Sequence, residues 1–170
     1  MTEPQVALRA WTEADLPLLR GLLGDPAMMT YLGGPESEER LLARHARYLA
    51  IDGTGTGRVF VITAGPGATP AGWVGYWETT WRGELAWETG WSVLPAFQGQ
   101  GIATRGTALA LAQAAADAKH RLIYAFPAVE NAPSNVVCAK LGFTQLGTES
   151  LEYPPGTWME CAVWRRELPT

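Results

Sequence analysis

The sequence contains few cysteines, few histidines and no long apolar run. Cys138 and Cys161 are the only cysteines among 170 residues, so neither a disulfide framework nor a zinc site is expected. We predict that both are small core residues and that the chain binds no metal. No apolar stretch reaches the length of about 18 residues that a membrane span requires, and the N-terminal residues lack the pattern of a signal peptide. We therefore expect a cytoplasmic protein without a membrane partner.

Basic residues are outnumbered, with 13 lysines and arginines against 17 aspartates and glutamates. The resulting net charge of −4 argues against nucleic acid as a partner. An anionic ligand would therefore be held by local backbone amides and a few side chains such as Arg105. The content of 47% hydrophobic and 18% charged residues is typical of a globular protein, and we expect residues 1–170 to form one domain.

Hydrophobic periodicity and turn residues predict the element order β-α-α-β-β-β-α-β-α-β-β. Thr12 and Asp15 form a variant capping box at the start of the first helix. The order predicts a mixed α/β (α+β) fold with a mostly antiparallel sheet flanked by helices. The predicted strands are 5–11, 58–64, 71–80, 84–93, 121–126, 143–151 and 157–168, and the later helices are 35–51, 103–119 and 134–141.

The segment 98–104 (QGQGIAT) links the predicted strand 84–93 to the longest helix. Gly99 and Gly101 allow a sharp backbone turn, and the free N–H groups of a first helical turn attract anions such as phosphate. A Rossmann loop is not favoured, because Thr104 occupies the third glycine position and the preceding strands have an antiparallel pattern. The other glycine-rich tract, 52–57, lacks a following helix and a P-loop lysine, so we predict a flexible turn.

This loop resembles the Q/R-x-x-G-x-G/A loop of the GNAT superfamily of N-acyltransferases, with Gln98, Gly101 and Ala103 at its named positions. The segment Asn131-x-x-Ser134, followed by KLGF at 140–143, is similar to that superfamily's later cofactor-contacting element. The ETGW run at 88–91 matches the branch of ribosomal-protein N-terminal acetyltransferases. The resemblance implies a splayed central sheet and transfer of an acetyl group from acetyl-CoA to a primary amine in a ternary complex.

The resemblance also implies a set of cofactor-binding residues. A backbone N–H near Val93 or Leu94 would polarise the thioester carbonyl, and one such donor contributes about 3 kcal/mol in acyl transfer. The implied residues for acetyl-CoA are Val93, Gln98, Gly99, Gln100, Gly101, Ile102, Ala103, Thr104, Asn131 and Ser134.

A catalytic base is expected on the strand before the loop. Neutralising a lysine-like amine at pH 7 costs on the order of 4–5 kcal/mol, against about 1.4 kcal/mol for an α-amine. Glu88 is the candidate base, on the same strand face as Glu84. The alternative is a structural glutamate that a neighbouring strand or loop satisfies. His45 and His120 are weaker candidates.

The leaving thiolate needs a proton or a hydrogen bond. Many members of the superfamily use a tyrosine seven residues after the asparagine, a position that Cys138 occupies here. Ser134 is therefore the candidate hydroxyl, and the alternative is that it only caps the following helix. We do not expect Cys138 to act as a nucleophile, because no histidine lies near it in the sequence.

Eight tryptophans are present, and five of them lie between residues 70 and 92. On the strand 84–93, Trp87 and Trp91 share one face, while Glu84, Glu88 and Ser92 share the other. Most rings should be core, and one or two beside the acidic face would suit an ammonium group. The resemblance implies that Met28, Met29 and Tyr31 lie in a helical region bordering the acceptor, which is a small molecule or a peptide amine.

Two alternative functions are an acyl-CoA sensor without catalytic activity and an ATP-binding module. The sensor is compatible with the missing tyrosine. The ATP-binding module is disfavoured, because no lysine follows the glycines. The sequence does not distinguish a monomer from a homodimer.

Overall fold

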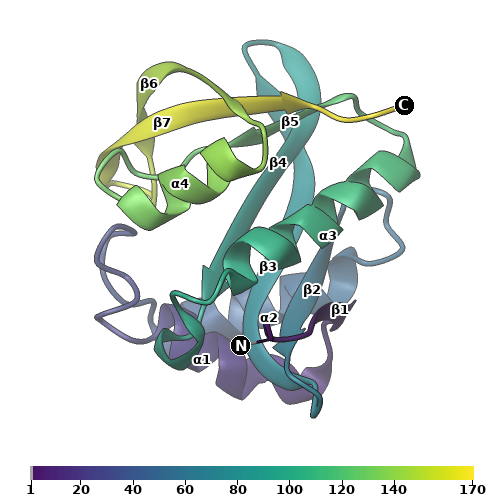
Figure 1. The fold of residues 1–170 in the computed structure, drawn as a ribbon. Coiled ribbons are helices and arrows are strands. Elements are labelled where there is room, and N and C mark those ends of the chain that lie inside the picture. The colour runs from purple at the N-terminus through teal and green to yellow at the C-terminus, as the bar shows by residue number, and fades with distance from the viewer. Residues whose placement is uncertain (1) are drawn as a thin grey trace.

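The computed structural model describes residues 2–170, which form a seven-stranded sheet in the order β1-β2-β3-β4-β5-β7-β6 (Figure 1). All neighbouring strands are antiparallel except β4 and β5, which are parallel. The predicted element order and the mixed, mostly antiparallel architecture are confirmed. The strands are β1 (Val6–Ala10), β2 (Gly57–Ala64), β3 (Thr69–Trp81), β4 (Glu84–Val93), β5 (Leu122–Ala125), β6 (Thr144–Glu152) and β7 (Trp158–Glu167).

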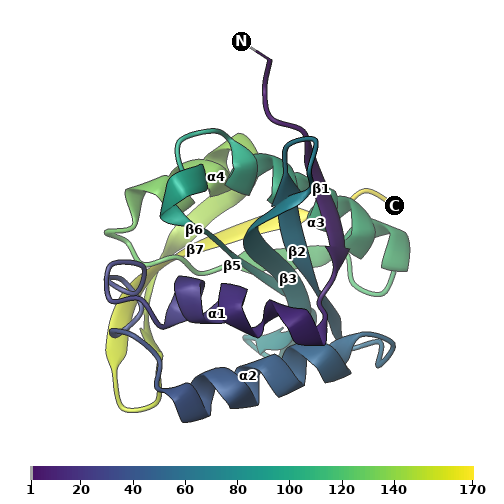
Figure 2. The same cartoon turned by 90° about the horizontal axis from the view of Figure 1, so that it is seen from below.

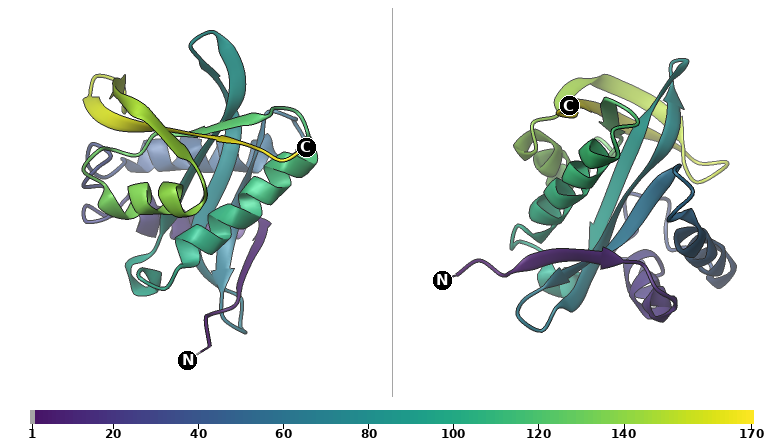
Figure 3. Two further views of the ribbon diagram at one scale, coloured as in Figure 1. Left: turned by 45° about the horizontal axis from the view of Figure 1, so that its top comes forward. Right: turned by 90° about the vertical axis from the view of Figure 1, so that its right-hand side faces the viewer.

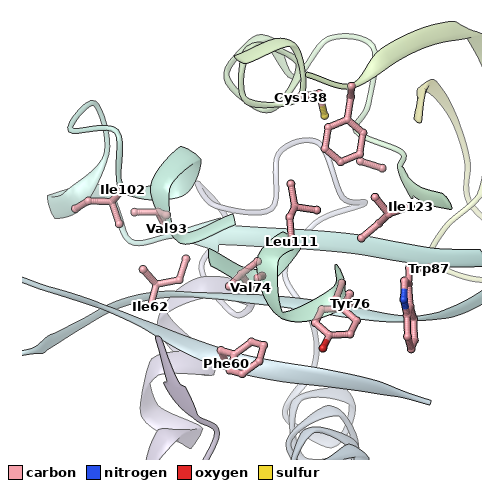
Figure 4. Close-up of a cluster of buried hydrophobic side chains, with 14 of the residues drawn as sticks. Phe60, Ile62, Val74, Tyr76, Trp87, Val93, Ile102, Leu111, Ile123 and Cys138 are labelled. Carbon is pink, nitrogen blue, oxygen red and sulfur yellow. The ribbon is translucent and has the colours of Figure 1, made fainter. Parts of the chain in front are cut away.

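Helices cover both faces of the sheet, with α1 and α2 below β1–β3 in Figure 2 and α3 and α4 on the opposite face. The α3 face holds the larger core, in which Tyr76 and Trp87 pack with Leu111 of α3 (Figure 4). No helix within residues 2–170 has the length and apolarity needed to cross a membrane. The helices are α1 (Leu16–Leu23), α2 (Glu38–Ile51), α3 (Ile102–Asp117) and α4 (Ala132–Lys140), with 3-10 turns η1 (Glu13–Asp15) and η2 (Pro95–Phe97).

The predicted capping box at α1 is present. Thr12 N donates to Asp15 Oδ2 at 2.7 Å, and Arg9 donates to both carboxylate oxygens at 2.8 and 2.9 Å. Burial alone would raise the pKa of Asp15, but these hydrogen bonds outweigh it and lower the pKa below its ordinary value. Asp15 thus fixes the chain direction between β1 and α1.

The segment between α1 and α2 differs from the prediction. Residues 26–33 form turns rather than a helix, because Pro26 disrupts the helical pattern and Gly33 and Gly34 adopt φ of 82° and 88°. Met29 is buried in the core beneath α1 and α2, whereas Tyr31 is 38% exposed. The expectation that both lie in a helical region was therefore wrong.

Strands β4 and β5 pair over two positions only, Trp87 with Ile123 and Glu88 with Tyr124. Beyond Glu88, β4 continues to Val93, while β5 stays paired with β7. The two strands diverge in Figure 1, and this confirms the splayed sheet that the family resemblance implies. Glu88 occupies the last paired position, at the start of the opening.

We predict that Gly72→Ala destabilises the protein, because β3 approaches β4 closely at this residue. A Cβ there would lie 2.2 Å from Ser92 O and 3.0 Å from Val93 Cα, both of them backbone atoms. The expected loss is about 1–3 kcal/mol in the free energy of unfolding, measured with urea. Gly67→Ala is the control, since its Cβ would meet only Thr69 Oγ1 at 3.9 Å. Equal stability of the two variants would contradict this account.

Candidate active site

The backbone of β4 supplies hydrogen-bonding groups to the opening. Leu94 N donates to Ala71 O at 2.8 Å, so this N–H faces β3. Because neighbouring residues of an antiparallel strand alternate in direction, the N–H and C=O of Val93 face away from β3. Val93 O accepts a hydrogen bond from Gln98 Nε2 at 3.0 Å. The Val93 N–H therefore points toward the opening, and the alternative donor, Leu94, is already used within the sheet.

The loop before α3 presents a run of unused donors. The N–H groups from Gly99 to Thr104 donate to no acceptor within residues 2–170. Gly99 and Gly101 adopt φ of 75° and 74°, and Gly101 is the N-cap of α3 without a capping side chain. Six adjacent N–H groups at the positive end of a helix form a site that fits a phosphate or pyrophosphate group.

Arg105 contacts backbone carbonyls of the loop and of the N-terminal segment. Its guanidinium donates to Gln100 O at 3.0 Å and to Pro4 O, and lies 3.9 Å from the Glu3 carboxylate. These contacts use only part of the five N–H groups of the guanidinium, so a role for Arg105 in holding the anion stays a prediction. Arg105 also holds the loop carbonyls and the N-terminal segment in place beside the free amides.

Glu88 lies in a half-buried position beside two tryptophan rings. Trp77 Nε1 donates to Glu88 Oε2 at 2.7 Å, and the two residues face each other across β3 and β4. The rings of Trp77 and Trp73 cover Gly90, where an added Cβ would lie 3.0 and 3.4 Å from them. Burial raises the pKa of Glu88, and the Trp77 hydrogen bond opposes this only in part.

These contacts agree in part with each interpretation of Glu88, as a structural glutamate and as a catalytic base. A neighbouring strand does satisfy one carboxylate oxygen, as the structural alternative requires. The other oxygen, Oε1, has no hydrogen-bond partner in the described part of the chain. Trp87 and Trp91 lie on the opposite face with the α3 core, as predicted. Glu88 therefore keeps a free oxygen with raised proton affinity on the face away from α3.

The start of α4 is organised by two asparagines. Asn131 Oδ1 accepts from Ser134 N at 3.3 Å, so Asn131 is the N-cap. The Ser134 hydroxyl has no partner among the residues described. Asn135, which the sequence analysis missed, donates to Asn131 O at 2.8 Å and accepts from Trp164 Nε1 at 2.8 Å. An asparagine inside a predicted helix, where this residue type is unfavourable, was the available signal.

The remaining candidates are held in structural contacts. Cys138 is fully buried, which raises the pKa of its thiol to about 12 and keeps it protonated near neutrality. His45 Nδ1 accepts from Trp11 Nε1 at 3.0 Å, and His120 Nε2 lies 2.8 Å from Glu78 Oε1. Neither histidine contacts Glu88 or the loop.

The β6–β7 hairpin is fastened to α2 and to the segment before it. Arg44 pairs with the buried carboxylate of Glu36 and donates to Tyr153 OH at 2.9 Å. Pro154 packs against Gly33, where a Cβ would lie 2.6 Å from Pro154 Cδ. These contacts join elements that are far apart in the sequence.

We predict that Glu36→Gln is strongly destabilising, because it leaves the Arg44 guanidinium, 15% exposed, without its charge partner. Breaking a buried pair costs about 3–5 kcal/mol in the free energy of unfolding. Glu38→Gln is the matched control, since Glu38 pairs with Arg20 at the surface, where solvent screens the pair and its loss should be far smaller. Chemical denaturation measures both, and a similar loss in the two variants would refute the role of the network.

Solved structures with the same fold cover nearly the whole chain. Spermidine N-acetyltransferase from Vibrio cholerae, in complex with CoA and spermine, has a TM-score of 0.78 at 22% identity over 96% of each chain. The Salmonella typhimurium acetyltransferase that modifies the N-terminal serine of ribosomal protein L7/L12 has a TM-score of 0.76 at 22% identity, over 96% of this chain and 95% of that chain. Ribosomal-protein-S5-alanine acetyltransferase from Vibrio fischeri has a TM-score of 0.77 at 19% identity, over 99% of this chain and 94% of that chain.

Sequence comparison identifies the family. No curated protein matches the chain. The model of the acetyltransferase (GNAT) domain matches residues 5–144, which include the loop, the opening and Glu88. With its fold and its free-amide loop in agreement, the chain belongs to the GNAT family of acetyltransferases.

Proposed function

We propose that the protein transfers the acetyl group of acetyl-CoA to a primary amine by direct attack in a ternary complex. The observation that carries this proposal is the opening between β4 and β5, with the Val93 N–H along it and the Glu88 carboxylate at its start. The similarity to an N-acetyltransferase solved with CoA and spermine, and to an acetyltransferase that modifies an N-terminal serine, supports an amine acceptor.

The residues that would hold acetyl-CoA fit its chemistry. The free amides from Gly99 to Thr104 match the acceptor oxygens of a pyrophosphate, and the chain needs no excess of basic residues to bind it. The backbone of Val93 would pair with the pantetheine arm. The proposed set is Val93, Gln98, Gly99, Gln100, Gly101, Ile102, Ala103, Thr104, Asn131 and Ser134.

When bound, acetyl-CoA supplies an acyl group activated as a thioester. Glu88 Oε1 accepts a proton from the ammonium group of the acceptor, for which its raised proton affinity is suited. The Val93 N–H, about 16 Å from Glu88 along β4, donates to the pantetheine arm that carries the acyl group toward Glu88. The Ser134 hydroxyl donates to the leaving sulfur.

We predict that Gly101→Glu abolishes binding of acetyl-CoA. The side chain would bring negative charge to the anion site and strain a backbone held at φ 74°. Gly101→Ala is the control for strain alone, since its Cβ would meet only Arg105 Nε at 3.7 Å, and it should retain measurable affinity. Calorimetric titration with acetyl-CoA measures both. Wild-type affinity in folded Gly101→Glu would rule out this loop as the pyrophosphate site.

We predict that Glu88→Gln lowers kcat by about 10²–10⁴-fold while the dissociation constant of acetyl-CoA is unchanged. In the wild type, kcat rises with pH as Glu88 loses its proton, and the raised pKa moves this limb above the ordinary glutamate value of about 4.3. The variant should lose the limb, and Glu39→Gln, at an exposed position on α2, should keep it.

Thiol release from acetyl-CoA, followed across a panel of amines and N-terminal peptides, tests the activity itself. An unchanged pH profile in Glu88→Gln would remove Glu88 as the base. Tight acetyl-CoA binding without turnover on any amine would instead favour the acyl-CoA sensor, a function compatible with Cys138 in place of a tyrosine.

A further inference from the structure

A groove of about 360 Å³ lies between the tip of the β3–β4 hairpin and the edge strand β6. Trp81, Arg82 and Glu84 line it from the hairpin, and Tyr124 and Glu149 line it from β5 and β6. None of these residues belongs to the acetyl-CoA site described above.

The groove lies on the same sheet face as Glu88. Tyr124 is the register partner of Glu88, and Glu84 precedes Glu88 by four residues on β4, so side-chain alternation places all three on one face. Arg165, another lining residue, faces Tyr124 across β5 and β7. Among the lining residues, Tyr124 lies beside Glu88 across β4 and β5, and Glu84 lies roughly 13 Å from Glu88 along β4, the length of about four extended residues.

This part of the face is not covered by helices. The helices on this side, α1 and α2, pack against β3 and β2 respectively. In the right-hand view of Figure 3, the β3–β4 hairpin and the β6–β7 hairpin both extend above them. The Arg44–Tyr153 contact holds the tip of the β6–β7 hairpin against α2. The groove therefore offers uncovered sheet surface to an acceptor that is longer than one residue.

The chemistry of the groove matches a polypeptide. The Trp81 and Tyr124 rings, 6.0 Å apart, form an aromatic floor. Two arginines, Arg82 and Arg165, balance two glutamates, Glu84 and Glu149, so the groove gives a polycation no net attraction. Strand β6 is the sheet edge, and its residues Leu146–Thr148 line the groove, where an extended peptide finds backbone groups to pair with.

The groove is bridged by one surface ion pair. Arg82 of the hairpin pairs with Glu149 of β6, with 73% and 38% of their side chains exposed. Solvent screens such an exposed pair, so a ligand opens it at little cost. Both groups then become available to charged side chains of an acceptor.

We propose that this groove binds the residues that follow the N-terminal residue of a polypeptide acceptor. The acceptor class is therefore an extended peptide or protein N-terminus rather than a polyamine. This inference rests on the proposed function, because the reacting amine must lie at Glu88.

The first experiment compares three acceptors in the thiol-release assay. They are a dipeptide amide, a peptide of about eight residues that starts with the same two residues and continues with alternating glutamate and lysine, and spermidine. We expect kcat/KM of the long peptide to exceed that of the dipeptide about tenfold, through KM, as one buried aromatic contact would give. Equal values for the two lengths, or a preference for spermidine, would overturn the inference.

Two variants test whether a preference for the longer peptide arises from the groove. Trp81→Ala removes the aromatic floor, and Arg82→Gly removes the bridge at a residue whose φ of 50° suits glycine. Each should raise KM for the long peptide until it matches the dipeptide. Leu85→Ala is the control, since Leu85 is 64% exposed on the other face of the hairpin, and it should preserve the advantage of the long peptide.

An effect of length that survives both groove variants would also overturn the inference, because the peptide would then bind elsewhere. The failure of the proposed function looks different: no amine, short or long, would release thiol from acetyl-CoA.

Discussion

The early end of the β4–β5 pairing is the constraint on which the site depends. After Glu88, β5 and the residues that follow it stay with β7, where Ala162 N donates to Pro127 O at 2.8 Å and Ala128 bridges Cys161. One edge of β4 is therefore left without a neighbouring strand up to Val93. An acetyl-CoA arm laid along that edge would complete the sheet, and its acyl end would lie near the half-buried carboxylate of Glu88.

In a chain with a net charge of −4, an anionic ligand would be held by local groups, and the loop from Gly99 to Thr104 offers unpaired backbone amides. Glycine conformations and the start of α3 present these amides, while Arg105 donates to carbonyls beside them. Burial of Glu88 is likewise a local effect on the site. Burial raises the pKa of Glu88 and the Trp77 hydrogen bond lowers it in part, while Gly90 leaves the room that the Trp73 and Trp77 rings occupy.

Local sequence patterns predict the parts of this site that are local. Period-two alternation places Glu88 on the face opposite Trp87, and the spacing of two glycines before a helix marks the anion loop. Contacts between distant residues were beyond such patterns. Trp77 contacts Glu88 because the register of the β3–β4 hairpin pairs them. Arg44 and Tyr153, which form a hydrogen bond, are 109 residues apart in the sequence. The hydrogen bond from Arg105 to Pro4 O depends on where the N-terminal segment lies in the fold. Leu94 was excluded as a donor only once its partner on β3 was known.

The central claim is that the open edge of β4 and the amides of the α3 loop bind acetyl-CoA together. Amide chemical shifts, followed by NMR while acetyl-CoA is added to the labelled protein, test it most directly. The largest changes should fall on Val93 and on the amides from Gly99 to Thr104, with Glu88 at the border. Largest changes in the other glycine-rich tract, at residues 52–57, would contradict it.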